Sequence, residues 1–185
     1  MSGINPTYPF TMSHPRAAAL PDPSEANWHV CHTRPRAEKK FAALMAAEDF
    51  EHYLPLIGSE RRYGARVRRF SKPLFPGYVF ARVEPARRSR IFQQDLLARV
   101  ITVEDEEKFL RQLADVRLIV ASGLELSLHP LIRRGTRVRV VSGPLRGLEG
   151  VVDDPANPKG IVLAVDVLQQ GLLVKMSLAD LQPLP

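Results

Sequence analysis

Residues 73–80 read PLFPGYVF and predict a sharp turn that leads directly into a strand. Proline fixes its own φ angle and glycine reaches positive φ values, so Pro73, Pro76 and Gly77 indicate the turn. Residues 78–83 then alternate in the way a strand with one buried face does. The predicted elements before and after residues 73–80 follow from this turn and strand.

The stretch just before this turn is polar and basic. Residues 58–71 predict a hairpin that projects from the body of the fold, with its tip near Tyr63 and Gly64. Residues 61–83 hold seven Lys and Arg residues and no Asp or Glu, in a chain whose formal net charge is +6. Such a run favours binding to a polyanion, and a solvated charged surface is the alternative.

Nearer the N-terminus, the sequence predicts a strand followed by a helix. Residues 28–33 alternate, which places Trp28, Val30 and His32 on one face of the strand. Apolar residues then recur at helical spacing through residues 36–49, with charged residues on the other faces. The helix would therefore pack one face on the sheet and leave its charged faces in water.

Downstream of the turn, the pattern continues with a helix, a strand and a helix. Residues 87–97 are compatible with a helix and residues 100–103 with a strand. Four acids at 104–107 favour the start of a helix, and Gly123 is a typical end for it. Residues 27–122 therefore predict an α+β domain with helices against an antiparallel sheet.

The two ends of the chain differ from this domain. Residues 1–26 are rich in proline and predict a disordered leader. Residues 123–130 predict a linker, and residues 131–185 predict a separate all-β domain, best fitted by a small five-stranded barrel. Its most evident strands are residues 137–141, 148–152, 161–165 and 172–176.

Nothing in the sequence forms a catalytic or metal site. His29 and His32 are the only closely spaced histidines, and on a strand they point to opposite faces. Cys31 is the single cysteine, and no nucleotide-binding or nucleophile motif is present. No secretory signal or membrane-spanning stretch is visible. The sequence predicts a cytoplasmic protein that is not an enzyme, with no catalytic residue, metal or cofactor.

Two groups of motifs resemble known families. Residues 135–152 read GTRVRVVSGPLRGLEGVV and resemble the KOW motif, in which glycines permit turn dihedrals and close packing between two strands. The matching turn residues are Gly143, Pro144, Gly147 and Gly150.

The stretch at residues 73–80 resembles the PxFPGYxF signature of the NusG N-terminal domain. Residues 28–30, which read WHV and precede a helix that contains Glu38, resemble the opening of the same domain. These motifs and the KOW motif occur in the order typical of the NusG family and span residues 27–185. The resemblance implies a NusG-type N-terminal domain at residues 27–122 and a KOW β-barrel at residues 131–185.

The family resemblance implies partners and site residues. The N-terminal domain of this family binds the clamp helices of RNA polymerase through an apolar cavity. The residues implied to bind polymerase are His32, Phe75, Pro76, Tyr78 and Phe80. Those implied to contact the non-template DNA strand in the elongation complex are Arg34, Arg36, Lys40, Arg61, Arg62, Arg66, Arg68 and Arg69. In this cavity we expect Tyr78 to be partly exposed and Phe80 to be more buried.

Two departures from the general factor resemble specialised RfaH-like paralogues. The run at residues 61–69 is unusually basic and lies close before Pro73. Residues 169–177 lack the GRxTPVEL-like run of the general factor, which argues against binding to the termination factor Rho. The implied function is operon-specific antitermination by a monomeric regulator that suppresses pausing or termination. The KOW domain could couple transcription to translation by binding a ribosomal protein.

Other classes of function stay open on sequence grounds. A KOW-type RNA-binding or ribosome-associated protein is the main alternative, although such a protein has no need of residues 73–80. An enzyme with an unrecognised site is a third. The sequence also predicts that the C-terminal domain rests in its β form. Pro144 would lie inside the first helix of a helical alternative, where a proline costs about 3 kcal/mol relative to alanine.

Overall fold

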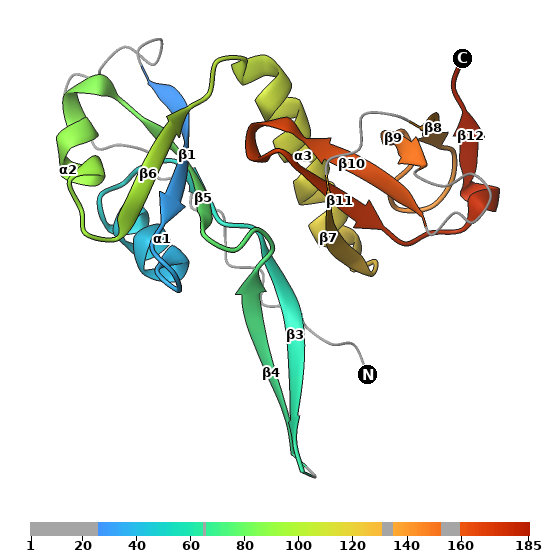
Figure 1. Cartoon of the computed structure of the whole chain (residues 1–185), viewed down its shortest axis with the longest axis horizontal. Coiled ribbons are helices and arrows are strands. Elements are labelled where there is room, and N and C mark those ends of the chain that lie inside the picture. The colour runs from blue at the N-terminus through green and yellow to red at the C-terminus, as the bar shows by residue number, and fades with distance from the viewer. Residues whose placement is uncertain (1–25, 65, 131–134, 153–159) are drawn as a thin grey trace. The chain divides into compact units, whose positions relative to one another are not determined.

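The computed structural model describes residues 26–64, 66–130, 135–152 and 160–185 (Figure 1). The chain divides into two compact units, residues 1–104 and 105–185. Both contain antiparallel sheets, and the few helices give the chain the α+β class that the sequence predicts. The predicted leader lies outside the described residues except for Ala26. Among the described helices, none has the length and apolar character needed to cross a bilayer.

The first unit is built on a four-stranded antiparallel sheet with the order β2-β5-β1-β6. Its strands are β1 (Asn27–Thr33), β2 (His52–Tyr53), β5 (Tyr78–Val83) and β6 (Leu97–Thr102). Its helices are α1 (Glu38–Ala47), the short 3-10 turn η2 (Pro85–Arg87) and α2 (Arg88–Phe92). Phe41 and Met45 of α1 and Ile91 of α2 pack with Cys31 and Val79 in one buried cluster. This face of the sheet is thus covered by helices, as predicted. The other face is buried as well at Trp28, Val30 and Phe80, so the alternation in sequence does not correspond to one buried and one exposed face.

The predicted basic hairpin forms a separate two-stranded sheet of β3 (Leu56–Tyr63) and β4 (Arg66–Pro73). Figure 1 shows it projecting from the four-stranded sheet of the same unit. Gly64 has a φ of 61°, which a glycine adopts without strain at this tip. The projection leaves both faces of most of the hairpin in solvent, and residues 66–70 are all exposed.

The helix predicted over residues 87–97 ends earlier, at Phe92. The chain turns after it, with the Leu97 N–H donating to the Gln94 carbonyl. Leu97 then begins β6, which pairs with β1 as far as the pair of Thr102 and His29. The strand is longer than predicted because its backbone groups cover the otherwise unpaired edge of β1.

The second unit begins with α3 (Glu106–Ser122). The Asp105 side chain accepts a hydrogen bond from the Lys108 N–H at 2.9 Å, and Gly123 ends the helix at a φ of 69°. The start was therefore predicted correctly from the four acids at 104–107, and the end from Gly123. The buried positions are Phe109, Leu113, Val116 and Ile119.

A six-stranded antiparallel sheet with the order β12-β8-β9-β10-β11-β7 completes the second unit. Its strands are β7 (Leu126–Pro130), β8 (Thr136–Val140), β9 (Glu149–Val152), β10 (Ile161–Val165), β11 (Gln170–Val174) and β12 (Leu181–Pro183). The short 3-10 turns η3 (Asp166–Leu168) and η4 (Leu178–Asp180) lie between them. The four predicted strands correspond to β8 to β11, and β7 and β12 extend them.

Two predicted boundaries differ from the structure. Residues 123–130, predicted as a linker, contain β7, which pairs with β11 through Leu128 and Leu172. The pairing satisfies an edge of β11 that would otherwise expose its backbone groups. In addition, α3 was predicted to belong with residues 27–122, whereas it falls in the second compact unit.

The turn between β8 and β9 has the dihedrals expected of its glycines. Gly143 and Gly147 have φ values of 75° and 92°, and Pro144 lies between them. A Cβ atom on Gly150 would lie 3.1 Å from the Val162 carbonyl oxygen, so this glycine permits close packing of two strands. Strands on both sides of Pro144 give this segment the β form predicted for it.

Candidate functional site

An aromatic pair lies on the sheet of the first unit. His32 and Tyr78 are direct partners across β1 and β5, and their rings stack with centroids 4.9 Å apart and planes 19° from parallel. Each side chain is half-buried, so one part of the stack contacts solvent. Direct cross-strand partners share a sheet face, which is why two residues far apart in sequence meet here.

Two of the residues implied to bind polymerase are buried phenylalanines. Phe75 and Phe80 have no exposed area, and their ring centroids lie 6.2 Å apart in an edge-to-face arrangement. The expectation that Phe80 is more buried than Tyr78 agrees with the structure. Of the five residues implied to bind polymerase, His32, Pro76 and Tyr78 reach the surface. Phe75 and Phe80 are not accessible to a partner in this state, and the Phe75 carbonyl accepts a hydrogen bond from the Tyr78 N–H at 3.1 Å.

The turn before β5 is tied to α1 and to β1. Oε1 of Glu38 accepts a hydrogen bond from the Gly77 N–H at 2.7 Å, and the Thr33 N–H donates to the Gly77 carbonyl at 2.8 Å. Gly77 has a φ of 85°, and a Cβ atom there would lie 3.3 Å from the His32 ring. Sequence reasoning noted Glu38 only as part of a family motif. No local signal reveals a contact with a turn 39 residues away.

The predicted nucleic-acid residues form two groups on different elements. Arg34, Arg36 and Lys40 are exposed at the start of α1, and Arg36 has a left-handed φ of 64°. The five arginines of the hairpin are also exposed. The Lys39 ammonium links the two elements by donating to the Ser71 carbonyl at 2.7 Å and approaching its hydroxyl at 3.1 Å.

The buried polar groups of the first unit do not form a catalytic arrangement. Burial raises the pKa of Cys31 to about 12, so its thiol stays protonated near neutral pH. His29 is fully buried, with Nε2 3.1 Å from Arg88 Nη2 and its ring edge-on to Phe92. Across the described ranges, no three His, Cys, Asp or Glu residues are grouped to hold a metal ion.

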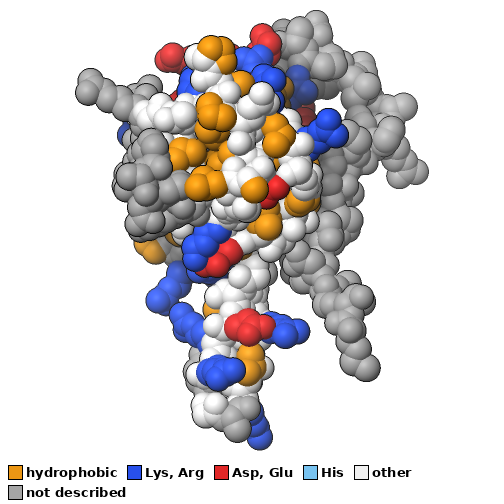
Figure 2. Space-filling view, turned by 90° about the vertical axis from the view of Figure 1, so that its right-hand side faces the viewer, with side chains coloured by type: hydrophobic (Ala, Val, Ile, Leu, Met, Phe, Trp, Pro, Cys, Tyr) orange, Lys and Arg blue, Asp and Glu red, His pale blue; other side chains and the backbone are white. Residues whose placement is uncertain are grey.

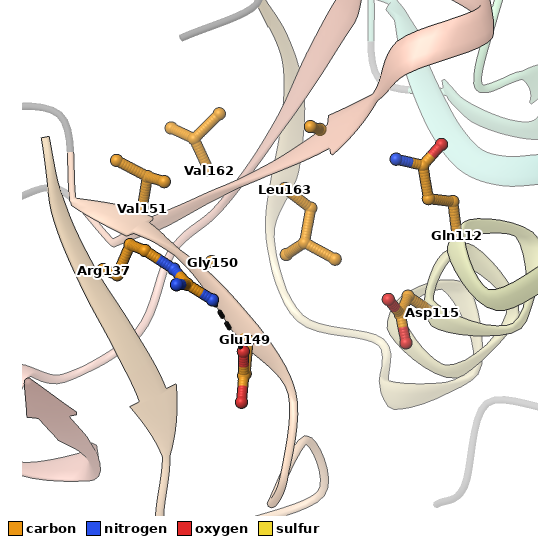
Figure 3. A pocket seen from close by; sticks show the side chains of 9 residues that line it. Gln112, Asp115, Arg137, Glu149, Gly150, Val151, Val162 and Leu163 are labelled. Atoms are coloured by element: carbon orange, nitrogen blue, oxygen red, sulfur yellow. Dashed lines mark hydrogen bonds and ion pairs between the residues drawn. The ribbon is translucent and has the colours of Figure 1, made fainter. Parts of the chain in front are cut away.

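A shallow hollow in the second unit lies between α3 and the sheet (Figure 3). Gln112 and Asp115 of α3 face strand residues that include Arg137, Glu149 and Gly150. Hydrogen bonding to Arg139 is the main cause that lowers the pKa of Glu149, and partial burial raises the pKa of Asp115. Glu149 forms ion pairs with Arg137 and Arg139. Its negative charge is therefore compensated within the protein, and the hollow gives no indication of a bound cation.

The family of the chain follows from a comparison with known protein families. The family model described as "Transcription termination factor nusG" matches residues 26–131, which is more than half of the chain. By class, the chain is a transcription elongation and termination factor. It belongs to the NusG family, whose members are non-enzymatic factors that bind RNA polymerase.

A solved structure has the same fold. It is described as "Domain interaction in Thermotoga maritima NusG" and superposes with a TM-score of 0.51 at 15% sequence identity. The match covers 89% of this chain and 100% of the other. At this identity the likeness establishes the fold alone. A search of curated proteins found no match.

Proposed function

We propose that the chain binds the clamp helices of RNA polymerase through the aromatic pair and suppresses pausing or termination. The observation that carries this proposal is the half-buried stack of His32 on Tyr78, whose strand and preceding turn also carry the buried Phe80 and Phe75. A preformed aromatic surface loses little side-chain freedom on binding, because the rings are already held by their neighbours. Pro76, which is exposed beside the pair in sequence, extends the apolar surface.

An assay of paused transcription complexes tests this function. The parent protein should shorten the lifetime of a pause, and a Tyr78→Ala variant should have no effect at the same concentration. A Leu178→Ala variant removes an exposed apolar side chain from the second unit and serves as the control. Loss of activity in the control alone, with an active Tyr78→Ala variant, would refute the assignment of this surface.

The exposed basic groups would contact the non-template DNA strand of the same elongation complex. The proposal is supported by Arg34, Arg36 and Lys40 at the start of α1 and by the hairpin arginines, all of which are exposed. Binding through phosphates releases counterions, so replacing several of these residues should flatten the salt dependence of DNA binding. Equal salt slopes for the parent and the variant would show that these side chains do not contact DNA and form a solvated surface.

We further propose a specialised, RfaH-like role in operon-specific antitermination, carried out in the cytoplasm by a monomer. Residues 131–185 would act as a KOW domain that recruits a ribosomal protein and not Rho. This is supported by the strand–turn–strand arrangement around Gly143, Pro144 and Gly147. Termination assays with and without Rho, and capture of ribosomal proteins by the full chain, test this role. A ribosome-associated function without polymerase binding would appear as capture of ribosomal proteins alone.

A further inference from the structure

The two faces of the basic hairpin differ in charge, which its composition alone does not indicate. β3 and β4 pair in register, with Arg61 opposite Arg68 and Glu60 opposite Arg69. Direct partners share a face and successive residues alternate between faces. Figure 2 shows Lys and Arg side chains around the hairpin, with an acidic side chain among them. The pairing register of β3 and β4 determines on which face of the hairpin each of these side chains lies.

One face, here called the arginine–phenylalanine face, carries Arg61, Arg66, Arg68 and Phe70. The Cζ atom of Arg61 lies 5.5 Å from the centroid of the Phe70 ring, and Phe70 is 38% exposed. A shallow hollow is lined by Arg61, Arg68 and Phe70 of this face and also by Arg69, which the register assigns to the opposite face. Within the described residues, no ion pair joins the three arginines of this face to an acid.

The opposite face, here called the ion-pair face, carries Glu60, Arg62, Val67 and Arg69. The Nε atom of Arg69 lies 2.6 Å from Oε1 of Glu60, and both side chains are more than half exposed. An exposed pair of this kind adds little stability, but it neutralises one arginine. The four residues of the ion-pair face therefore carry a net charge of one, against three on the arginine–phenylalanine face.

We propose that the arginine–phenylalanine face binds single-stranded nucleic acid, with phosphates on Arg61, Arg66 and Arg68 and a base stacked on Phe70. The proposal rests on the proposed function, because it assigns one strand of the elongation complex to one face of the hairpin. A single strand offers unstacked bases to an exposed ring, whereas a duplex keeps its base faces covered. The combination of these arginines and an exposed ring therefore favours a single strand.

A pair of adjacent arginines allows a matched test of the face. Arg61→Gln and Arg62→Gln each remove one charge, but from opposite faces. Binding of the full chain to a labelled oligothymidylate is measured at several salt concentrations. We expect Arg61→Gln to weaken binding several-fold and to lower the salt slope by about 0.7, since one phosphate contact is lost. Arg62→Gln should weaken binding less than Arg61→Gln, because its side chain lies on the opposite face from the proposed contacts. Equal losses, or no binding by the parent at low salt, would overturn the proposal.

The stacking contact is tested with Phe70→Leu, which keeps an apolar side chain but removes the ring. The parent should bind oligothymidylate about fivefold or more tightly than an abasic oligomer of the same length, and the variant should lose this preference. A parent that binds a duplex as tightly, or a variant that keeps the preference, would contradict the proposal. Capture by polymerase is measured in parallel. Polymerase binding without single-strand binding refutes this inference alone, whereas a parent protein that does not bind polymerase refutes the proposed function.

Discussion

The Gly77 N–H donates a 2.7 Å hydrogen bond to Oε1 of Glu38, and this contact joins the first turn of α1 to the turn that precedes β5. Glu38 is only 8% exposed, so water does not readily replace it as the acceptor. Gly77 is followed directly by Tyr78, whose ring stacks on His32. The position of the aromatic pair thus depends on a carboxylate outside the sheet.

Glu38→Ala should destabilise the first unit and weaken polymerase binding. The Gly77 N–H would lose its acceptor. This loss costs about 1–3 kcal/mol for a fully buried donor, and we expect the lower end of that range because the contact is only partly buried. Glu38→Gln keeps an oxygen at this position and should restore most of both properties. Denaturant unfolding followed by Trp28, the only tryptophan and a buried residue of this unit, measures the stability. Equal effects of the two substitutions would show that the hydrogen bond is not what holds the turn.

Gly77→Ala should disturb the aromatic pair directly. A left-handed φ costs an L-residue about 1–2 kcal/mol, and the new Cβ would press on the His32 ring at 3.3 Å. Gly64→Ala is the matched control, because Gly64 also has a positive φ but a Cβ atom there would have no neighbour within 4 Å. Both variants should lose stability, and only Gly77→Ala should lose affinity for polymerase. If both variants lost affinity for polymerase, the loss could not be attributed to the contact with the His32 ring.

Cys31 should be inert in the folded protein. Burial raises its pKa from the ordinary 9.0 to about 12, so the thiolate that reacts with alkylating reagents is scarcely populated near neutral pH. Because the folded state holds this proton more tightly than the unfolded state, stability should fall as the pH rises from about 9 towards 12. Mass spectrometry after alkylation, with and without denaturant, measures the protection. Rapid labelling of the native protein would contradict the burial.

The C-terminal domain predicted at residues 131–185 should be in its β form in the free full-length protein. Residues Thr136–Val140 and Glu149–Val152 are strands, and the turn between them contains Pro144, which has no N–H to donate in a helix. Backbone chemical shifts should therefore report strand at both segments without any partner. Helical shifts across residues 137–152 would refute this prediction.

The parts of the fold that sequence predicted correctly depend on local signals. The four acids at 104–107 and Gly123 indicated the ends of α3, because helix ends are decided within a few residues. The hairpin was also predicted from a local signal, the polar stretch at residues 58–71 with Gly64 near its tip. β7 was predicted as part of a linker because it is stabilised by pairing with β11, which lies far along the chain. Strand propensity in so short a segment is too weak to reveal that pairing.

In the candidate site, too, local signals were predictable from the sequence and long-range contacts were not. Family resemblance and alternation brought His32 and Tyr78 together, and the structure agrees. The full burial of Phe75 and the contact of Glu38 with Gly77 both depend on how distant segments pack. The charge difference between the hairpin faces required the register, since a shift by one residue would move every arginine to the other face.

The affinity of the full chain for RNA polymerase, measured by titration for the parent, Tyr78→Ala and Tyr78→Phe, tests the central claim most directly. An aromatic residue at the centre of an interface often contributes about 2 kcal/mol or more, which corresponds to about 30-fold in the dissociation constant. Tyr78→Phe keeps the ring that stacks on His32 and should bind like the parent. We therefore predict a loss of about 30-fold or more for Tyr78→Ala alone, with Trp28 fluorescence unchanged. A folded Tyr78→Ala variant with the affinity of the parent would contradict the account.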